Sequence, residues 1–268
     1  MKSNLHTHTI FCDGNNTPEE VVLSAIDKGF TSIGFSAHGF SAFDLTYCIK
    51  DVEGYIKEIN ALKEKYKEKI EVYLGIEEDA YAPMDRKLFD YIIGSCHYFF
   101  VDGKYYPIDS NFDCFKKGLE LFNYDVIKLS ENYYEYFCTY IKKRKPDVIG
   151  HFDLITKFDE IDGNRLLSNK EYIALSEKYV REAIKSGSLF EFNTGAISRK
   201  YRSFPYPYEN LLHIIKKEGA GITLSSDSHD ASTIDFYFEE SKKILKDLGF
   251  SHIYTLSKGE FIKEGLII

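Results

Sequence analysis

The chain has 268 residues, with 34 Lys and Arg against 42 Asp and Glu, so its formal net charge at pH 7 is −8. This acidic balance argues against a protein that binds duplex nucleic acid, because such proteins need clustered Lys and Arg to displace counterions. Hydrophobic residues make up 44% of the chain and charged residues 28%, which excludes wholesale disorder. The length suits one large domain of barrel size, and we expect a single domain over 1–268.

Nothing in the sequence predicts a membrane span or a secretion signal. No window approaches the roughly 18 consecutive apolar residues of a membrane helix, and the start of the chain lacks the apolar stretch of a signal peptide. The cysteines are odd in number and form no C-x-x-C pair, so free thiols in a reducing compartment are the simplest interpretation. We therefore expect a cytoplasmic protein.

Short β-rich runs alternate with longer helical patterns along the chain. The first helix is expected to open at a capping box, Thr17-Pro18-Glu19-Glu20, and to stop at Gly29. A second capping box is expected at 168–171, at the start of a helix over 168–185. The other expected elements, in chain order, are a strand at 32–36, a helix at 52–69, strands at 71–76 and 91–94, a loop at 101–112, helices at 113–122 and 125–143, strands at 148–150 and 189–192, a helix at 208–217, a strand at 221–225, a helix at 233–247 and a strand at 252–256.

Strands separated by helices predict a parallel sheet, and seven or eight such units in one domain favour a closed barrel over an open sheet. We therefore expect an α/β barrel. The segment 98–145 carries two helices where a barrel needs one. We interpret it as a helical excursion within the domain that supplies part of a ligand pocket.

Most of the histidines fall where expected strands end. In a parallel α/β barrel all strands end on one rim, so residues far apart in the sequence converge there. A lone buried histidine is more often a core residue than a ligand; His213 and His252 lack this placement, and we interpret His213 as part of a helix face and His252 as structural. Glu77 and Asp227 also stand at strand ends. The six histidines at strand ends are His6, His8, His38, His97, His151 and His229.

Together these residues predict a metal centre. His6 and His8 are two positions apart, so on a strand both imidazoles point to the same side. Imidazole and carboxylate ligands serve Zn, Mn and Fe(II) equally well. With Asp13 the candidate ligands are too many for one ion and suit two or three divalent ions with a bridging carboxylate. The candidates are His6, His8, Asp13, His38, Glu77, His97, His151, Asp227 and His229.

The order of these motifs resembles the polymerase and histidinol phosphatase (PHP) superfamily over nearly the whole chain. The motifs are His6-Thr7-His8-Thr9, Ala37-His38, Glu77, Gly94-Ser95-Cys96-His97, Gly150-His151-Phe152-Asp153 and Ser226-Asp227-Ser228-His229. Three further features resemble its histidinol-phosphatase branch: Glu191-Phe192-Asn193-Thr194-Gly195, the Tyr-Pro pair at 206–207, and the run 223–229.

The resemblance implies a distorted (β/α)7 TIM-like barrel with a trinuclear metal site at the C-terminal rim of the strands. Some members of the family carry His where this chain has Asp13, and an oxygen ligand there favours Mn or Fe over Zn. Carried over position by position, the resemblance implies one ion on His6, His8, Glu77 and Asp227, a second on Glu77, His97 and His151 with Glu77 bridging, and a third on Asp13, His38 and His229.

The histidinol-phosphatase branch implies a phosphoric monoester hydrolase of histidine biosynthesis that converts L-histidinol phosphate to L-histidinol and phosphate. A metal-bound hydroxide is expected to attack phosphorus in line, while the ions neutralise the non-bridging oxygens. Glu77, Asp227 and His229 are the residues expected to serve this chemistry. The donor of a proton to the leaving alkoxide stays unassigned.

Substrate contacts are predicted from the loops after the strands. Arg199 lies in the loop 194–205 and Arg165 in the loop after His151, and a guanidinium can grip phosphate oxygens in bidentate fashion. Lys200 and Arg202 are weaker candidates. The ammonium and imidazole of the substrate need a carboxylate and an aromatic wall, and these roles stay open among Asp109, Asp153, Tyr105, Tyr106, Phe158 and Tyr201.

Two other interpretations stay open. A PHP-type phosphatase or phosphodiesterase could act on another small phosphate ester or a nucleotide; the acidic chain has no basic track that would favour a DNA-processing module. A metal-binding regulatory or storage protein would saturate its ions with protein ligands and turn nothing over. We expect a small-molecule phosphate ester as partner, without nucleic acid or membrane. The metal identity, the oligomeric state and any regulation are not predicted.

Overall fold

The computed structural model describes residues 1–163 and 165–266. Within these residues one parallel sheet has the strand order β1-β2-β3-β4-β7-β8-β9. Neighbouring strands in this sheet are also consecutive along the chain, except that the segment 98–145 is inserted between the fourth and the fifth of them. This order is expected for successive β-α units. The strands are β1 (Ser3–Asn4), β2 (Ser32–Phe35), β3 (Glu71–Asp79), β4 (Tyr91–Ser95), β7 (Val148–Ile149), β8 (Leu189–Asn193) and β9 (Ile222–Ser225).

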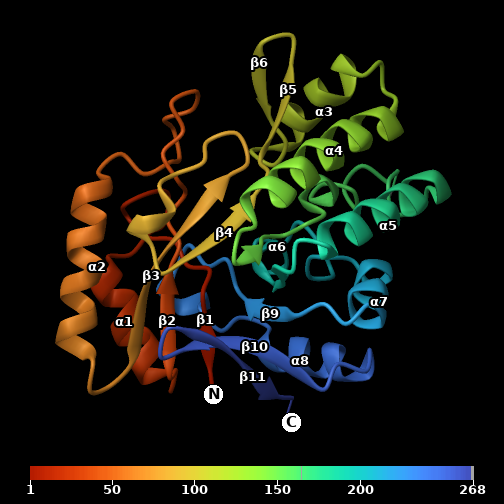
Figure 1. Cartoon of the computed structure of the whole chain (residues 1–268). Coiled ribbons are helices and arrows are strands. Elements are labelled where there is room, and N and C mark those ends of the chain that lie inside the picture. The colour runs from red at the N-terminus through yellow and green to blue at the C-terminus, as the bar shows by residue number, and fades with distance from the viewer. Residues whose placement is uncertain (164, 267–268) are drawn as a thin grey trace.

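The two edges of the sheet meet just beyond the ends of β1 and β9. The backbone N–H of His8 donates to the carbonyl of Ser228 at 2.8 Å, and the N–H of Ser228 donates to the carbonyl of His6 at 3.2 Å. Thr7 and Ser228 thereby form a parallel bridge. The bridge nearly closes the sheet into a barrel, and the expected (β/α)7 TIM-like fold is confirmed (Figure 1).

Tyr91 fills the interior of the barrel. Its side chain is 1% exposed, and its hydroxyl donates to the carbonyls of Leu5 and Phe35. Gly34 and Gly75 face the Tyr91 ring, and a Cβ at either position would overlap it. The two glycines therefore make room for a large side chain that connects three strands.

Helices cover the outside of the sheet. The capping box at Thr17 is confirmed, whereas the one expected at 168–171 was wrong: Asn169 is the N-cap of α5, and its side chain accepts from the N–H groups of Glu171 and Tyr172. No helix in the described part of the chain has both the length and the apolar character needed to span a membrane. The helices of at least one full turn are α1 (Pro18–Asp27), α2 (Val52–Tyr66), α3 (Phe112–Leu121), α4 (Val126–Arg144), α5 (Lys170–Ile184), α6 (Gly195–Ser198), α7 (Glu209–Lys217) and α8 (Phe238–Asp247).

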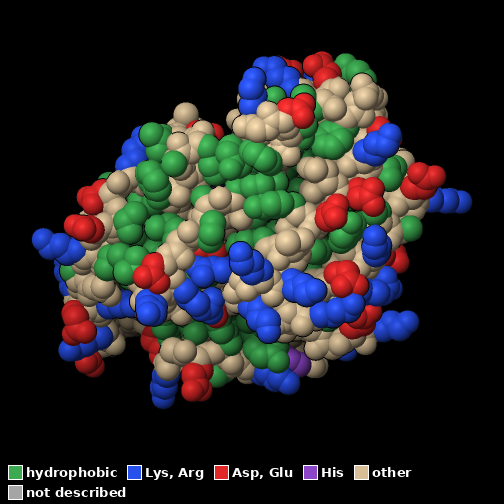
Figure 2. Space-filling view, turned by 45° about the horizontal axis from the view of Figure 1, so that its top comes forward, with side chains coloured by type: hydrophobic (Ala, Val, Ile, Leu, Met, Phe, Trp, Pro, Cys, Tyr) green, Lys and Arg blue, Asp and Glu red, His purple; other side chains and the backbone are tan. Residues whose placement is uncertain are grey.

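The excursion 98–145 begins with an antiparallel hairpin, β5 (Tyr98–Val101) and β6 (Lys104–Pro107). The loop expected at 101–112 was therefore partly wrong. Asp102 and Gly103 both have positive φ, at 50° and 77°, which is the conformation of a tight hairpin turn. The hairpin and α3 stand at the end of the barrel toward which the sheet strands point (Figure 1). Figure 2 shows a lobe that rises above the rest of this face, with hydrophobic side chains gathered at its base.

A second hairpin ends the described chain. The strand expected at 252–256 is present as β10 (His252–Ser257), but it pairs with β11 (Glu260–Gly265) and not with the barrel strands. Leu256 of this hairpin packs with Leu5 and Tyr73 in the barrel interior. The hairpin thus covers the N-terminal end of the barrel and leaves the opposite end for a site (Figure 1).

Candidate metal centre and substrate pocket

The expected residues meet at the C-terminal end of the strands. His6 and His8 follow β1, His38 follows β2, and Glu77 lies within β3. His97 follows β4, His151 follows β7, and Asp227 and His229 follow β9. The structure therefore brings all six histidines at strand ends into one cluster. His213 is exposed on α7, and His252 lies on β10 at the other end of the barrel, outside this cluster.

Glu77 stands at the centre of the cluster and is 1% exposed. Its Oε2 lies 3.2 Å from His6 Nε2 and 2.8 Å from His38 Nδ1. Its Oε1 lies 3.3 Å from His97 Nε2 and 2.9 Å from His151 Nε2. One carboxylate thus faces four imidazoles from four different strands, an arrangement that suits a bridging ligand.

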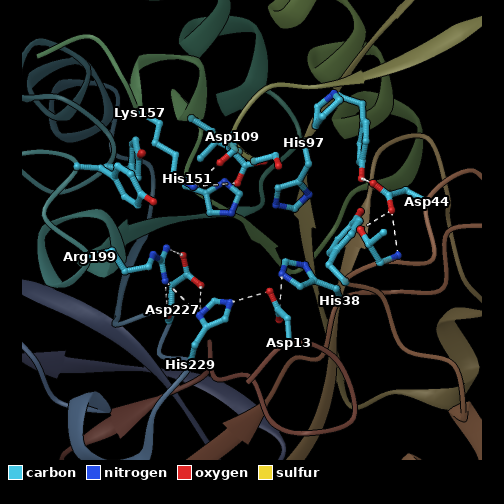
Figure 3. Close-up of a pocket in the computed structure, with 18 residues that line it drawn as sticks. Asp13, His38, Asp44, His97, Asp109, His151, Lys157, Arg199, Asp227 and His229 are labelled. Atoms are coloured by element: carbon cyan, nitrogen blue, oxygen red, sulfur yellow. Dashed lines mark hydrogen bonds and ion pairs between the residues drawn. The ribbon is translucent and has the colours of Figure 1, made fainter. Parts of the chain in front are cut away.

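Asp227 and Asp13 extend the cluster toward the cavity. Asp227 Oδ1 lies 3.2 Å from His8 Nε2, and Asp13 Oδ2 lies 3.2 Å from His229 Nε2. Asp13 Oδ1 is 3.7 Å from His38 Nε2 (Figure 3). Asp227 has a φ of 48°, a left-handed conformation that is uncommon outside glycine and is often found at functional sites.

The donor atoms suit divalent cations. In four groups, the ligand atoms of histidines and carboxylates lie within 4.8 Å of one another. Among the described residues, Nε2 of His6, Nε2 of His8 and Oε2 of Glu77 are buried without a hydrogen-bond partner. Buried polar atoms are rarely left unpaired, so a cation between them explains their arrangement. The groups are His8, Asp13, His38 and His229; His6, Glu77 and His151; His6, His8 and Asp227; and His38, Glu77 and His97.

The electrostatics of the cluster also favour a cation. Burial raises the pKa of Glu77, but the imidazoles of His6, His38 and His97 outweigh burial and hold this pKa well below its usual value. Burial would lower the pKa of His6, yet the carboxylates of Glu191, Glu77 and Asp227 raise it well above the usual value. The carboxylates therefore stay ionised, and positive charge is stabilised between them.

His8 behaves differently from His6. Burial lowers its pKa to about 3, and the nearby imidazoles of His229 and His38 contribute to the decrease. His8 is therefore neutral near neutral pH, which is the form of imidazole that binds a metal ion.

A cavity of about 330 Å³ opens above the cluster, within the usual range for small-molecule sites. Two cations, Arg199 and Lys157, line one side of it, and Asp44 lines the opposite side (Figure 3). The hydroxyl of Tyr206 is buried in its wall and, among the described residues, has no hydrogen-bond partner. The excursion 98–145 contributes Tyr98, Pro107, Asp109 and Ser110 to the lining.

Comparison with known families agrees with this geometry. The family model for the PHP domain matches residues 4–195, which include seven of the nine predicted ligands. The chain belongs to the PHP domain family. Its two remaining predicted ligands, Asp227 and His229, lie beyond the matched segment, but the structure places them at the same rim.

Relatives of similar length carry one name. A Schizosaccharomyces pombe protein named "probable histidinol-phosphatase" is 27% identical over 285 residues, covering 97% of this chain and 90% of its own. The histidinol-phosphatase of Bacillus subtilis is 26% identical over 265 residues, covering 89% of this chain and 97% of its own. A solved structure of histidinol phosphate phosphatase from Lactococcus lactis, in complex with zinc, L-histidinol and phosphate, has a TM-score of 0.73 and 22% identity. The match covers 98% of this PHP chain and 99% of the Lactococcus lactis chain.

The observed groupings differ from the ligand sets that the resemblance implied: His97 and His151, expected on one ion with Glu77, fall into separate groups. His38 lies in the group of Asp13 and His229, as expected, but its Nδ1 is also 2.8 Å from Glu77 Oε2. Likewise, His6 groups with Glu77 and His151 as well as with His8 and Asp227. Two imidazoles of this PHP site therefore each belong to two of the four groups.

The two predicted phosphate contacts lie in different places. Arg199 lines the cavity, where its Nη1 donates to the Asp227 carbonyl at 2.8 Å and its Nη2 donates to Asp227 Oδ2 at 2.9 Å. Arg165 is exposed, pairs with Asp162 at 3.1 Å and does not line the cavity. Lys157, which the sequence did not single out, reaches the cavity wall and donates to the Asp109 carbonyl at 2.6 Å.

The residues considered for binding the ammonium and imidazole of the substrate also lie in different places. Asp109 and Tyr201 line the cavity, but Tyr105, Tyr106 and Phe158 are not among its lining residues in the described chain. Asp153 is buried, 3.7 Å from Arg202, and accepts from the N–H of Tyr208. The Arg202 guanidinium carbon in turn lies over the Tyr206 ring, 4.1 Å from the ring centroid. The Asp153–Arg202 pair therefore supports the cavity wall at Tyr206.

Sequence reasoning missed two carboxylates that contact the Nδ1 atoms of histidines in the cluster. Glu191 Oε1 lies 2.6 Å from His6 Nδ1, and Asp79 Oδ2 lies 3.1 Å from His97 Nδ1. Asp79 is two positions after Glu77 on the same strand, so it lies on the same side. That spacing was the signal for Asp79 in the sequence, but it does not show which imidazole the carboxylate contacts.

Proposed function

We propose that this chain is a divalent-metal-dependent phosphomonoesterase that hydrolyses L-histidinol phosphate to L-histidinol and phosphate. The observation that carries the proposal is the convergence of six imidazoles and three carboxylates at the floor of one cavity that also holds Arg199 and Lys157. The relatives named histidinol-phosphatase, and the zinc, L-histidinol and phosphate of the Lactococcus lactis structure, support this substrate.

We assign two or three ions, of Zn, Mn or Fe, to the cluster, held by its histidines and carboxylates. Divalent ions in such a site neutralise the charge of a phosphoryl group and lower the pKa of water. Glu77 serves as the shared ligand, because its two oxygens face different pairs of imidazoles. Asp227 and His229 complete the side of the site nearest Arg199. The proposed ligands are His6, His8, Asp13, His38, Glu77, His97, His151, Asp227 and His229.

Arg199 binds and orients the phosphate in this proposal. Its contacts with Asp227 and with His229 Nδ1 at 3.1 Å fix the guanidinium beside the cluster, and its remaining donors are left for phosphate oxygens. Lys157 lies on the same side of the cavity, where its ammonium pairs with Asp109 Oδ2 at 3.3 Å, and it adds further N–H donors there (Figure 3). Arg165, which lies outside the cavity, is not needed for this role.

The charge distribution of the cavity suits a substrate with an anionic and a cationic end. Asp44 stands across the cavity from Arg199 and Lys157, where a substrate ammonium group would meet a carboxylate (Figure 3). Tyr47 and Tyr98 line the same side, and Tyr98 donates to Asp44 at 2.8 Å. We place the phosphate at the cluster and the amino-alcohol portion toward Asp44.

The whole chain over 1–268 acts as one PHP-type barrel domain in this proposal, with the excursion 98–145 as part of the cavity wall. A cytoplasmic location belongs to the same proposal. All five cysteines are free, which suits a reducing compartment.

The direct test is phosphate release from L-histidinol phosphate by the metal-loaded protein and by three variants. His8→Ala and Asp227→Ala each remove a proposed ligand, and we expect turnover to fall by at least about a thousandfold, the scale of other essential catalytic groups. His213→Ala is the matched control, since His213 is exposed on α7 and pairs only with Glu209 at 3.7 Å among the described residues. Wild-type turnover in metal-loaded His8→Ala would contradict the assignment.

A further inference from the structure

Glu191 is a buried carboxylate at the wall of the cluster that faces away from the cavity. It lies on β8, is 1% exposed, and does not line the cavity. Its Oε1 lies 2.6 Å from His6 Nδ1 and accepts from the hydroxyl of Ser225. Its Oε2 accepts from the N–H of His151 at 2.8 Å and from the Asn193 amide at 2.9 Å. Four donors from different parts of the rim therefore fix one carboxylate.

This arrangement determines which nitrogen of His6 is available to a ligand. A carboxylate oxygen 2.6 Å from a ring nitrogen accepts a hydrogen bond from it, so when His6 carries a single ring hydrogen, that hydrogen is on Nδ1. The lone pair is then on Nε2, which lies 3.2 Å from Glu77 Oε2 and 3.6 Å from Asp227 Oδ1. Among the described residues Nε2 has no hydrogen-bond partner, so its lone pair and two carboxylate oxygens face the same point.

We propose that Glu191 is a positioning residue of the metal centre, which holds His6 in the Nδ1–H tautomer and so presents Nε2 to an ion shared with Glu77 and Asp227. The inference rests on the proposed metal centre but not on the identity of the substrate. Outer carboxylates that bind ligand histidines change metal affinity by about 10- to 100-fold in other proteins. Glu191 also connects His6 to the backbone of His151, so it sets the distance between two ligands on opposite sides of Glu77.

Glu191→Gln tests the role with little change of shape. If the amide oxygen faces His6, the amide nitrogen meets two donors, the His151 N–H and the Asn193 amide. If the amide nitrogen faces His6, it donates to Nδ1 and moves the ring hydrogen to Nε2, where it blocks the ion. Either orientation weakens the site, and we expect zinc affinity to fall by about 10- to 100-fold.

Glu78→Gln is the matched control. Glu78 is the neighbour of Glu77 on β3 and is fully buried, but it pairs with Arg144 at 2.6 Å and with the Tyr140 hydroxyl at 2.7 Å. Its replacement removes the ion pair with Arg144 without touching a histidine of the cluster. We expect this variant to lose thermal stability and to keep wild-type zinc affinity.

The measurement is competition for Zn²⁺ between a chelating dye and the metal-free protein, without substrate. Support requires weaker zinc binding in Glu191→Gln than in Glu78→Gln, together with a shift or loss of the low-field Nδ1–H proton resonance of His6 in the zinc-loaded variant. Equal zinc affinity in wild type and Glu191→Gln would overturn the inference and leave the proposed function intact. A wild type that binds no zinc would overturn both, while failure to hydrolyse L-histidinol phosphate would overturn only the proposed substrate.

A second variant covers the case in which Glu191→Gln does not fold. Glu191→Asp keeps the charge but withdraws the carboxylate by one methylene from His6 Nδ1, and we expect the same direction of change. Asp79→Asn provides an independent comparison, because Asp79 Oδ2 lies 3.1 Å from His97 Nδ1 and so contacts a second histidine of the cluster in the same way. Unchanged zinc affinity in Glu191→Asp would contradict a role that depends on the His6 contact.

Discussion

Replacing Arg199 by alanine separates binding of the phosphate from binding of the metals. Arg199 is the cavity cation nearest to the cluster, with its guanidinium 2.9 Å from Asp227 Oδ2 and 3.1 Å from His229 Nδ1. A bidentate grip on a phosphate uses two charge-assisted hydrogen bonds, each worth about 1.5–3 kcal/mol. Taking the lower figure for both gives about 3 kcal/mol, so kcat/KM for L-histidinol phosphate should fall by about 150-fold.

The assay is steady-state phosphate release with zinc or manganese content measured on the same samples. Arg165→Ala is the control, since Arg165 is exposed and pairs with Asp162 outside the cavity, and we expect its kcat/KM to stay within about twofold of wild type. Part of the Arg199→Ala loss will appear in KM, and part in kcat if the grip tightens in the transition state. A kcat/KM for Arg199→Ala equal to that of Arg165→Ala, at full metal occupancy, would refute the reasoning.

Three further outcomes follow from the geometry. Chelation should abolish phosphate release and lower the midpoint of thermal unfolding, because ions present at about 1,000 times their dissociation constant contribute about 4 kcal/mol of stability; activity that survives complete metal removal would be the contrary result. Asp44→Asn should raise KM for L-histidinol phosphate about tenfold and leave p-nitrophenyl phosphate unchanged, since only the former carries an ammonium group; equal effects on both esters would remove Asp44 from substrate recognition. Gly75→Ala should lower the free energy of unfolding by about 3 kcal/mol, because its Cβ overlaps the Tyr91 ring in the barrel interior, and an unchanged urea midpoint would contradict that packing.

The barrel and the cluster could be predicted from the sequence because both follow from periodic patterns. Strands that alternate with helices imply a parallel sheet, and the C-terminal ends of its strands share one rim, so His6 and His229 meet although 223 positions separate them. Element boundaries depend on local competition between caps. Asn169 and not residue 168 is the N-cap of α5, because its side chain accepts from the N–H groups of Glu171 and Tyr172.

Residues that act through non-local contacts could not be predicted in the same way. Arg165 and Lys157 both follow His151 in the chain, but the path of the intervening loop places only Lys157 at the cavity. Glu191 was visible as part of a family motif, while its contact with His6 depends on strand register across the barrel. The hairpin at 98–107 had a turn signal in Asp102-Gly103, but the prediction of a loop at 101–112 did not use it.

The central claim is that this PHP domain hydrolyses L-histidinol phosphate with metals bound at the rim of its barrel. The most direct measurement is kcat/KM for L-histidinol phosphate, AMP and p-nitrophenyl phosphate with protein loaded in turn with Mn, Zn and Fe(II). We predict metal-dependent phosphate release in which L-histidinol phosphate exceeds the other two esters by at least about a hundredfold, the discrimination that a few placed polar contacts provide. Slow, metal-dependent release from all three would contradict the substrate and indicate another small phosphate ester or a nucleotide. No metal-dependent release from any ester would contradict the function itself.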